Sequence, residues 1–140
     1  MAALLRRVLS RAVALSLGVG LSLGLLLSAC GGGGGLLSGN YVDDTVKVAD
    51  TLLATIALPQ DDAGHAAAES EARSLINDYM ARYRPQQQRG GQLSFTTMQT
   101  ALNSLAGHYA NYANRPLPEA LRSRLEKELK KAEASAVRGA

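Results

Sequence analysis

The most constraining feature of this sequence is an apolar stripe between Phe95 and Tyr112. Apolar residues recur there at steps of three and four, the spacing of one face of an α-helix: Phe95, Met98, Leu102, Leu105, Tyr109 and Tyr112. Such a stripe has to be buried against other elements, so we expect it to form a core face. The helix is expected to begin near Ser94, or at Thr96, whose spacing to Gln99 is that of a capping box.

The opposite face of this helix is unusual because it carries no charge. Between Ser94 and Asn114 there is no Asp, Glu, Lys or Arg. The residues that we expect on the outside are Thr100, Asn103, Gly107 and Asn111. A helix exposed on one side of a small bundle usually carries charge there, so this uncharged face predicts a surface on which a partner docks.

Three further segments show the same periodicity, and we expect helices over Tyr41–Leu58, about His65–Arg84 and from Glu119 onward. The residues expected to point inward are Val42, Val46, Ala49, Leu53 and Ile56 in the first, Ala68, Ala72, Leu75, Ile76, Tyr79 and Tyr83 in the second, and Leu121, Leu125, Leu129, Ala132 and Ala136 in the last. Each stripe needs a partner to bury it, so the helices are expected to pack on one another.

Turn residues delimit these helices. Asn40 is placed to cap the first helix, and Asp61 or Asp62 the second. Pro59 and Pro85 are expected to end them, because proline disfavours the helical conformation in the residue before it. Short links favour antiparallel neighbours, so we predict an all-α fold, an up-down-up-down antiparallel four-helix bundle.

The chain opens with a basic and then apolar leader. Residues 1–29 carry arginines ahead of an apolar run, and small residues stand immediately before Cys30. The run is short and interrupted by glycine, so it predicts a secretory signal peptide cut by a lipoprotein signal peptidase rather than a spanning helix. We expect residues 1–29 to be removed, Cys30 to carry acyl chains such as palmitate, residues 30–38 to form a glycine-rich tether, and residues 39–140 to form the bundle.

Composition excludes several classes of function. Of the 15 basic residues, three belong to the leader, which leaves 12 against 12 acidic residues in the mature chain. A formally neutral protein gives no support for nucleic-acid binding. The single cysteine is expected to be lipidated, so neither an internal disulfide nor a cysteine-based metal site is expected.

The residues that most often carry chemistry do not converge in this sequence. His65 and His108 lack the spacing of a metal site. We expect His65 to be solvated and His108 to pack or hydrogen-bond. The pairs Asp43-Asp44 and Asp61-Asp62 could attract calcium or manganese, but acids are favoured at helix starts anyway, and adjacent residues on a helix diverge. We therefore expect no enzymatic activity, no cofactor and no metal site.

Several segments together resemble one known family. They are Gly39 to Thr45 (GNYVDDT), Ala57 to Asp62 (ALPQDD), Glu71 to Tyr79 (EARSLINDY), Ser94 to Tyr109 (SFTTMQTALNSLAGHY) and Asn114 to Glu119 (NRPLPE). In this order they are similar to the small photosystem II assembly and repair lipoproteins of the cyanobacterial thylakoid lumen, the Psb-twenty-seven family.

The resemblance implies a monomeric four-helix bundle held by its lipid on the lumenal side of the thylakoid membrane. Its implied partner is the lumenal domain of the smaller inner chlorophyll antenna in immature photosystem II. The implied action is steric: the protein keeps extrinsic oxygen-evolving subunits from docking early and leaves the manganese cluster site open. The alternatives are a manganese or calcium delivery protein, and a general periplasmic lipoprotein.

The partner-binding candidates combine the uncharged helix face with a neighbouring link. They are Thr100, Asn103, Gly107 and Asn111 on the helix, Asn114, Arg115 and Pro116 in the link, and Arg82 and Tyr83 as additional candidates. Turn chemistry alone would also explain the link residues.

Overall fold

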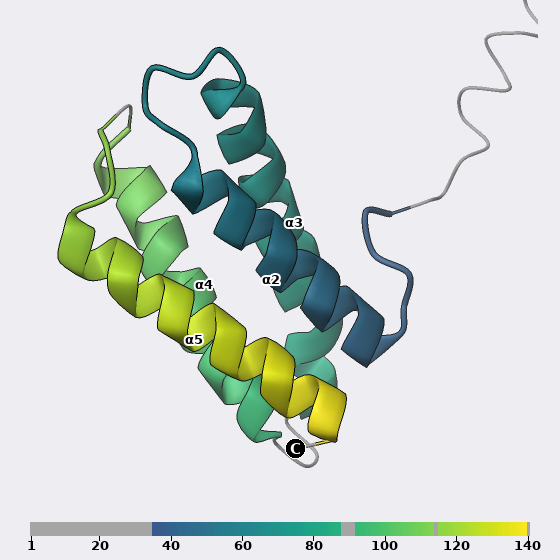
Figure 1. The fold of residues 1–140 in the computed structure, drawn as a ribbon. Coiled ribbons are helices and arrows are strands. Elements are labelled where there is room, and N and C mark those ends of the chain that lie inside the picture. Colours follow the sequence, from purple (N-terminus) through teal and green to yellow (C-terminus); the bar gives the residue numbers. More distant parts are fainter. Residues whose placement is uncertain (1–34, 88–91, 114, 140) are drawn as a thin grey trace, which may run out of the picture. The chain divides into compact units, whose positions relative to one another are not determined.

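A computed structural model describes residues 35–87, 92–113 and 115–139 (Figure 1). The leader and Cys30 lie outside these residues, so their predicted roles stay predictions. The described chain forms four α-helices: α2 (Tyr41–Ala57), α3 (His65–Gln87), α4 (Leu93–Asn111) and α5 (Glu119–Arg138). No strand occurs among the described residues.

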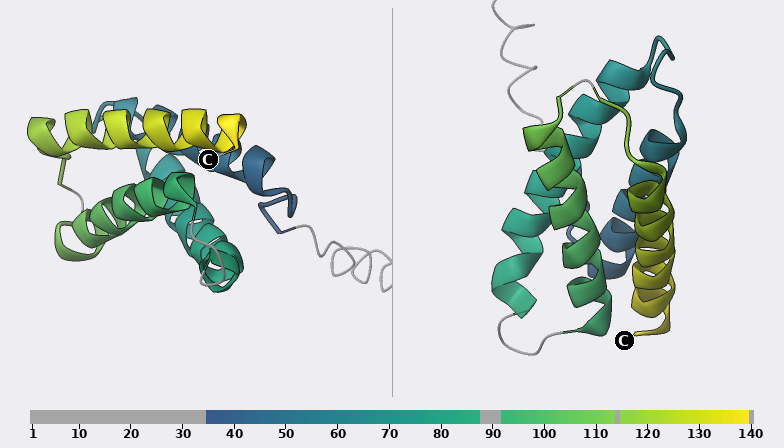
Figure 2. Two further views of the ribbon diagram at one scale, coloured as in Figure 1. Left: turned by 90° about the horizontal axis from the view of Figure 1, so that it is seen from below. Right: turned by 90° about the vertical axis from the view of Figure 1, so that its left-hand side faces the viewer.

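Each helix packs on its neighbour in sequence, and α5 closes the bundle against α2. Figure 2 shows α2 and α5 on one side of the bundle and α3 and α4 on the other. Successive helices run in opposite directions, so the predicted up-down-up-down four-helix bundle is confirmed (Figure 1). None of the described helices is long and apolar enough to cross a membrane.

The helices of the bundle meet at two ends. At one end of the bundle lie the start of α2, the end of α3, the start of α4 and the end of α5, and we call this the strap end. It comprises residues 35–44, 80–87, 92–98 and 131–139. The link end comprises residues 55–70, 106–113 and 115–122, where α2 connects to α3 and α4 to α5. The strap is the segment of residues 35–40 that precedes α2.

The predicted cap of α2 is confirmed, whereas the acid before α3 binds the residue ahead of that helix. Asn40 Oδ1 accepts hydrogen bonds from the backbone N–H groups of Val42 (3.0 Å) and Asp43 (3.2 Å). Of the two acids expected before α3, Asp62 accepts from the backbone N–H of Gly64 at 2.7 Å. Helix α4 begins at Leu93, close to the first of the two predicted starts, so Thr96 lies inside its first turn rather than at a cap.

Pro85 does not end α3, contrary to the prediction. The helix continues to Gln87, with Pro85 in its last turn. Proline has no N–H to donate to the carbonyl of Ala81, but Ala81 is exposed, so water is available to that carbonyl. The neighbouring carbonyl of Arg82 accepts instead from the side-chain amide of Gln86, at 3.0 Å. A proline in an exposed last turn is therefore tolerated.

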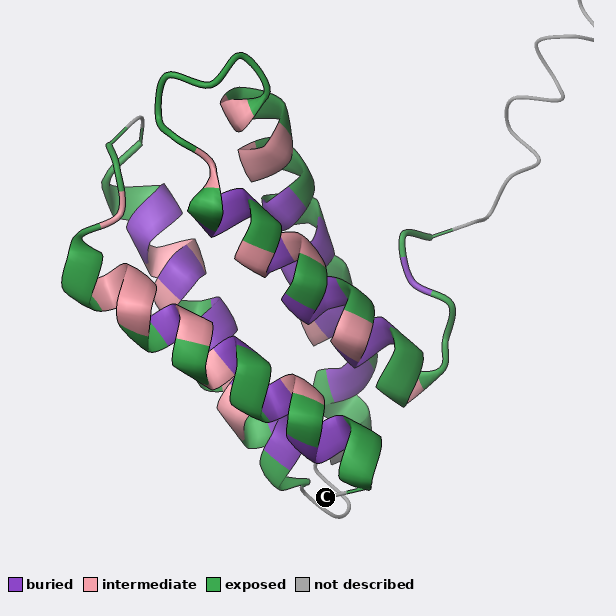
Figure 3. Cartoon of the chain, viewed as in Figure 1, coloured by how far each residue is buried: buried purple, intermediate pink, exposed green. Residues whose placement is uncertain are grey.

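The buried faces of α3 and α5 match the predicted stripes closely, whereas that of α2 is rotated (Figure 3). The buried residues of α2 are Asp44, Thr45, Val48, Ala49, Leu52, Thr55 and Ile56, and Val42, expected inside, is exposed. The polar members of this face are satisfied internally: Thr45 Oγ1 donates to Tyr41 O at 2.6 Å, and Thr55 Oγ1 to Thr51 O at 2.8 Å.

Tyr112 also departs from the predicted stripe of α4. Helix α4 ends at Asn111, and Tyr112 adopts a non-helical conformation (φ −130°, ψ 55°) as its C-cap. A residue past the last helical turn no longer follows the helical periodicity, so its side chain is 54% exposed. The other five members, Phe95, Met98, Leu102, Leu105 and Tyr109, are buried as predicted.

The strap packs onto the bundle instead of extending from it. Leu37 is buried in the core, and Ser38 donates to Asp44 Oδ1 from its backbone N–H (2.6 Å) and its hydroxyl (2.7 Å). The backbone N–H of Gly39 donates to Asp44 Oδ2 at 2.9 Å. The folded unit therefore begins at Gly35, before the boundary expected at Gly39.

Candidate partner-binding surface

The outward side of α4 is exposed and uncharged, as the sequence predicts. Thr100, Asn103 and Asn111 are exposed, and Gly107 is half-buried. We call these four residues the neutral face. A Cβ added at Gly107 would meet nothing within 4 Å, so this glycine leaves open space on the surface. No packing requirement within the described bundle explains the absence of a side chain there.

Two polar side chains of the neutral face, those of Thr100 and Asn111, are turned toward their own helix. The hydroxyl of Thr100 donates to Thr96 O at 3.0 Å, and the side-chain amide of Asn111 donates to Gly107 O at 2.8 Å. Next to them, the hydroxyl of Ser104 donates to Thr100 O at 2.9 Å. Because the four residues themselves carry no charge, covering them requires little desolvation of ionic groups, whereas Arg124 of α5, which donates to Ser104 Oγ at 2.6 Å, adds a cation beside them.

The link that follows α4 is held close to the end of the helix. His108 is buried, and its Nε2 lies 3.1 Å from the carbonyl oxygen of Arg115. The backbone N–H of Arg115 donates to Tyr112 O at 3.2 Å. Arg115 and Pro116 are themselves exposed, while Asn114 lies outside the described residues. His108 thus has the hydrogen-bonding role expected of it, and the side chain of Arg115 is available to a partner.

A shallow groove borders the neutral face on the side of α3. Its volume is about 180 Å³, and it is lined by Arg73, Ile76, Asn77, Ala106, Tyr109 and Ala110. The guanidinium of Arg73 lies 5.2 Å from the centre of the Tyr109 ring, donates to Tyr109 O at 3.3 Å and pairs with Glu69 at 2.5 Å. Arg73 therefore adds a positioned cation at the edge of the neutral face.

The sequence did not single out Arg73. Its spacing to Glu69 is that of an i, i+4 ion pair, which by itself indicates only a solvated helix face. The tertiary contact with Tyr109 has no signal in the sequence. Burial and the charge of Glu69 raise the pKa of Tyr109 to about 12, against the opposing effect of Arg73, so this phenol stays neutral near pH 7.

The remaining two candidates do not join this surface. Tyr83 is 1% exposed, and its hydroxyl donates to Asp44 Oδ2 at 2.5 Å, so its selection as a surface residue is wrong. Arg82 is exposed, but it lies beside the strap, where a Cβ on Gly39 would come within 3.0 Å of its Nη1. Arg82 is therefore next to Gly39 of the strap, which precedes α2, whereas the neutral face lies on α4.

The acid pairs are arranged for structure rather than for a shared ion. Asp44 is 1% exposed and accepts all four hydrogen bonds from the strap and Tyr83, whereas its neighbour Asp43 is exposed. Among the described residues, no group of three or more His, Cys, Asp or Glu side chains is placed to hold a metal ion. Asp44 is therefore a structural carboxylate that the sequence alone did not identify.

Comparisons with known proteins are consistent with this fold. The family model described as Photosystem II Pbs27 matches residues 6–135. The chain is 50% identical to the Photosystem II lipoprotein Psb27 of Synechocystis sp. over 135 residues, 96% of this chain and 97% of that protein. It is also 50% identical to the Photosystem II assembly factor lipoprotein Psb27 of Thermosynechococcus vestitus, over 81% of this chain and 84% of that protein.

A solved structure is similar as well. The solution structure of Psb27 from cyanobacterial photosystem II superposes with a TM-score of 0.72 at 51% identity. The superposition covers 76% of this chain and 93% of that one, which is the extent of the bundle without the leader.

Proposed function

This chain belongs to the Photosystem II Pbs27 family, and on that premise we propose that it is an assembly factor of photosystem II. The observation that carries the proposal is the extent of the match, which spans nearly the whole of both chains at 50% identity to a relative named as a photosystem II lipoprotein. The relatives are named as lipoproteins and assembly factors, in line with a role by binding rather than by catalysis. As expected of the family, this protein associates with the thylakoid membrane.

We further propose that acyl chains on Cys30 hold the protein on the lumenal side of that membrane. The leader pattern before Cys30 supports this, as does the family match, which extends back to residue 6. Two or more acyl chains give stable attachment where one chain gives marginal binding. A tethered protein meets membrane partners at a high effective concentration, so a modest intrinsic affinity is sufficient.

The proposed partner is the lumenal domain of the smaller inner antenna subunit in immature complexes. Bound there, the bundle blocks premature docking of extrinsic subunits and leaves the manganese cluster site accessible. This action requires the protein to bind the immature complex more tightly than the finished one, since only a difference in affinity determines which state it occupies. The neutral face, with Arg115 and Pro116 next to it, is the surface that we assign to this contact.

The assignment is tested by placing a charge on the neutral face. Asn103 is exposed in the middle of α4, so Asn103→Arg is expected to leave the fold intact and to weaken capture of the antenna subunit at least about tenfold, a typical loss for an unpaired charge in an interface. Ala54→Arg, at an exposed position of α2, is the matched control. The measurement is pull-down from solubilised thylakoids, with circular dichroism as the check on folding.

Unchanged capture by a folded Asn103→Arg variant would exclude the neutral face. Replacement of Arg115 tests the link in the same way. Calorimetry with manganese on the purified protein addresses the delivery alternative, since a tight site would favour it. Co-purification addresses the general lipoprotein alternative, since association with envelope components alone would contradict a role in photosystem II.

A further inference from the structure

The strap end carries most of the exposed large apolar side chains. Five such side chains are exposed among the described residues: Leu36, Val42, Leu93, Tyr112 and Val137. All but Tyr112 belong to the strap end, because α2 and α4 begin there and α5 ends there. Leu93 is 58% exposed and Val137 64%. Single exposed apolar residues are ordinary, but their concentration at one end of a small bundle indicates a contact surface.

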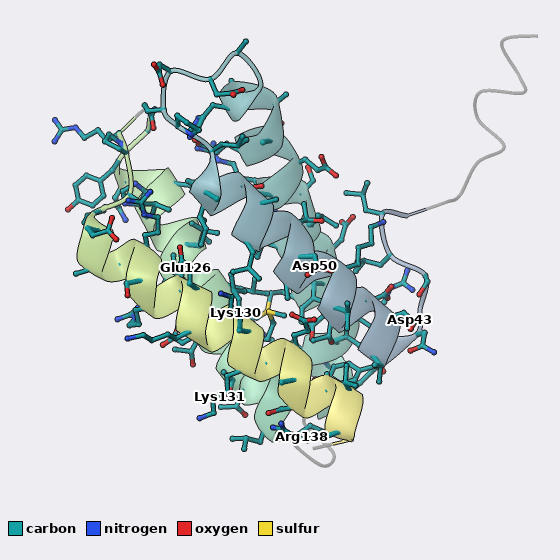
Figure 4. All side chains as sticks on the ribbon, viewed as in Figure 1. Asp43, Asp50, Glu126, Lys130, Lys131 and Arg138 are labelled. Carbon is teal, nitrogen blue, oxygen red and sulfur yellow. The ribbon has the colours of Figure 1, made fainter. Side chains whose placement is uncertain are left out.

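The charges at the strap end are mainly positive. Arg82, Arg84, Lys131 and Arg138 are exposed there, opposed by the exposed Asp43 and the half-buried Glu133. Figure 4 shows Asp43, Lys131 and Arg138 toward this end of α2 and α5. Asp44 is buried and fully hydrogen-bonded, so it contributes no exposed carboxylate. The link end has the opposite balance, with acids at 61, 62, 69 and 119 against arginines at 115 and 122.

The folded unit also begins close to the expected lipid. Between Cys30 and Gly35 there are five peptide steps, which span at most about 18 Å when fully extended. Gly35 is not free to move away from the strap end, because Leu37, Ser38 and Gly39 are fixed on the bundle. An acyl group on Cys30 therefore keeps the strap end within reach of the bilayer surface.

We propose that the strap end rests on an anionic lipid surface, with its exposed Leu and Val side chains in the interface and its Arg and Lys side chains at the headgroups. Apolar side chains flanked by long cations suit this environment, since the cations place their stems among lipid and their charges in the headgroup region. The inference rests on the proposed lipid attachment. The inference goes beyond that attachment, because a lipid on Cys30 alone would leave the orientation of the bundle unspecified.

The proposal fixes which parts of the protein face the lumen. Helix α4 has 19 residues and is about 28 Å long, so the link end stands roughly that far above the strap end. The neutral face then runs upward from the membrane along α4, with Arg115 near its outer limit. A partner contacting the whole face must project from the membrane by a similar distance.

The test compares two labelled positions on α5. Ala120 and Ala134 are both exposed, one toward the link end and the other toward the strap end, about 21 Å apart along the helix. Each is replaced by cysteine in the acylated full-length protein, in which Cys30 is blocked, and labelled with an environment-sensitive fluorophore. The protein is reconstituted into vesicles of one part phosphatidylglycerol to two parts phosphatidylcholine with a headgroup quencher.

Quenching is expected to be several-fold stronger at position 134 than at position 120. Equal quenching at both positions in acylated protein would overturn the proposal, because it would show a bundle without a preferred orientation. The intact mass of the same sample reports acylation separately. A protein without acyl chains would contradict the proposed anchoring itself, which distinguishes the two failures.

Charge reversal provides a second, independent measurement. Arg84→Glu combined with Arg138→Glu should reduce the quenching at position 134 toward that at 120, because each arginine near an anionic surface contributes on the order of fivefold to the bound population. Arg115→Glu combined with Arg122→Glu, at the link end, should leave the quenching at position 134 unchanged. Equal effects of the two pairs would overturn the assignment of the strap end.

Discussion

The strap end and the link end close the same bundle by different means. At the strap end and in the turns next to it, side chains hydrogen-bond between elements: Tyr83 with Asp44 (2.5 Å), Thr45 with Tyr79 (2.8 Å) and Tyr41 with Ser94 (2.7 Å). The rings of Tyr41 and Tyr83 are 5.3 Å apart, and those of Tyr79 and Tyr83 5.0 Å. This end is filled by aromatic rings whose hydroxyl groups are paired.

The link end carries two surface cavities. A surface cavity of about 480 Å³ lies between the α2–α3 connection and the end of α4, with Asp62, His65, Glu69 and Arg73 in its lining. A smaller one of about 130 Å³ lies under Arg115 and Pro116. The difference indicates that the rigid part of the molecule is where the chain enters the bundle, whereas the part farthest from Gly35 retains space for a partner.

The largest predicted effect is on the carboxylate at the strap end. Asp44→Ala leaves the donors of Ser38, Gly39 and Tyr83 without an acceptor in a buried site, so we expect the free energy of unfolding to fall by about 3 kcal/mol. Asp62→Ala, which removes one exposed acceptor at the link end, should cost about 0.5–1 kcal/mol. Urea denaturation of both variants checks this. Similar losses would show that the two ends are equally rigid.

The second prediction concerns acid. Burial by itself raises the pKa of Asp44, but the hydrogen bonds from Tyr83, Ser38 and Gly39 outweigh it, so the pKa lies below its ordinary value. The carboxylate therefore stabilises the folded state fully above its unfolded pKa of about 3.9, and this contribution is lost as the pH falls below that value. Asp44→Asn should show a weaker loss of stability over this acid range than the wild type.

Denaturation midpoints measured at a series of pH values report this dependence. Asp61→Asn, at an exposed position, is the matched control. An unchanged slope in Asp44→Asn would mean that other acids determine the acid stability of the bundle.

The third prediction applies one substitution to both ends. Tyr83→Phe removes a buried donor to Asp44 and should destabilise the fold by about 1.5–2 kcal/mol, within the range for hydrogen bonds to charged groups. Tyr109→Phe, at the link end, removes a hydroxyl with no hydrogen bond to the described residues, and should cost less than about 0.5 kcal/mol. Thermal and urea unfolding of the pair measure the difference. A larger loss at Tyr109 would reverse the comparison.

The smallest effects on stability are expected from alanine substitutions at two glycines, one of which destabilises the fold while the other stabilises it. Gly39 has φ +96°, and its Cβ would lie 3.0 Å from Arg82 Nη1, so Gly39→Ala should cost about 1 kcal/mol. Gly107 lies in a helix with open space around it, so Gly107→Ala should stabilise the fold by about 0.5–1 kcal/mol. If stability rises while capture of the antenna subunit falls, the neutral face is shaped for its partner. Destabilisation by Gly107→Ala would contradict the open space at that position.

The sequence was sufficient for those parts of the fold in which apolar residues make the interior. The stripes of α3 and α5 and most of α4 follow from periodicity alone, and the antiparallel order follows from the short links between the helices. The interior of α2 could not be predicted in this way. Asp44, Thr45 and Thr55 are buried because they form hydrogen bonds, two of which join residues far apart in sequence.

The candidate surface was predictable only in part. The absence of charge on α4 is visible in the sequence, and the exposure of Thr100, Asn103 and Asn111 agrees with that pattern, with Gly107 half-buried. The burial of Tyr83 and the position of Arg73 over Tyr109 depend on tertiary contacts that no local pattern encodes. The sequence predicts that residues 35–38 belong to the tether because they follow a glycine run, whereas the backbone N–H and hydroxyl of Ser38 donate to Asp44.

The attachment of the strap to Asp44 also determines how the molecule responds to mechanical load. A pull at Gly35 acts on three hydrogen bonds from Ser38 and Gly39 to Asp44, which lies in the first turn of α2. The same carboxylate accepts a fourth bond from Tyr83 of α3, so the force that reaches Asp44 is shared between two helices. Drag on a membrane-held protein would therefore move the bundle as a whole instead of unravelling it from its first helix.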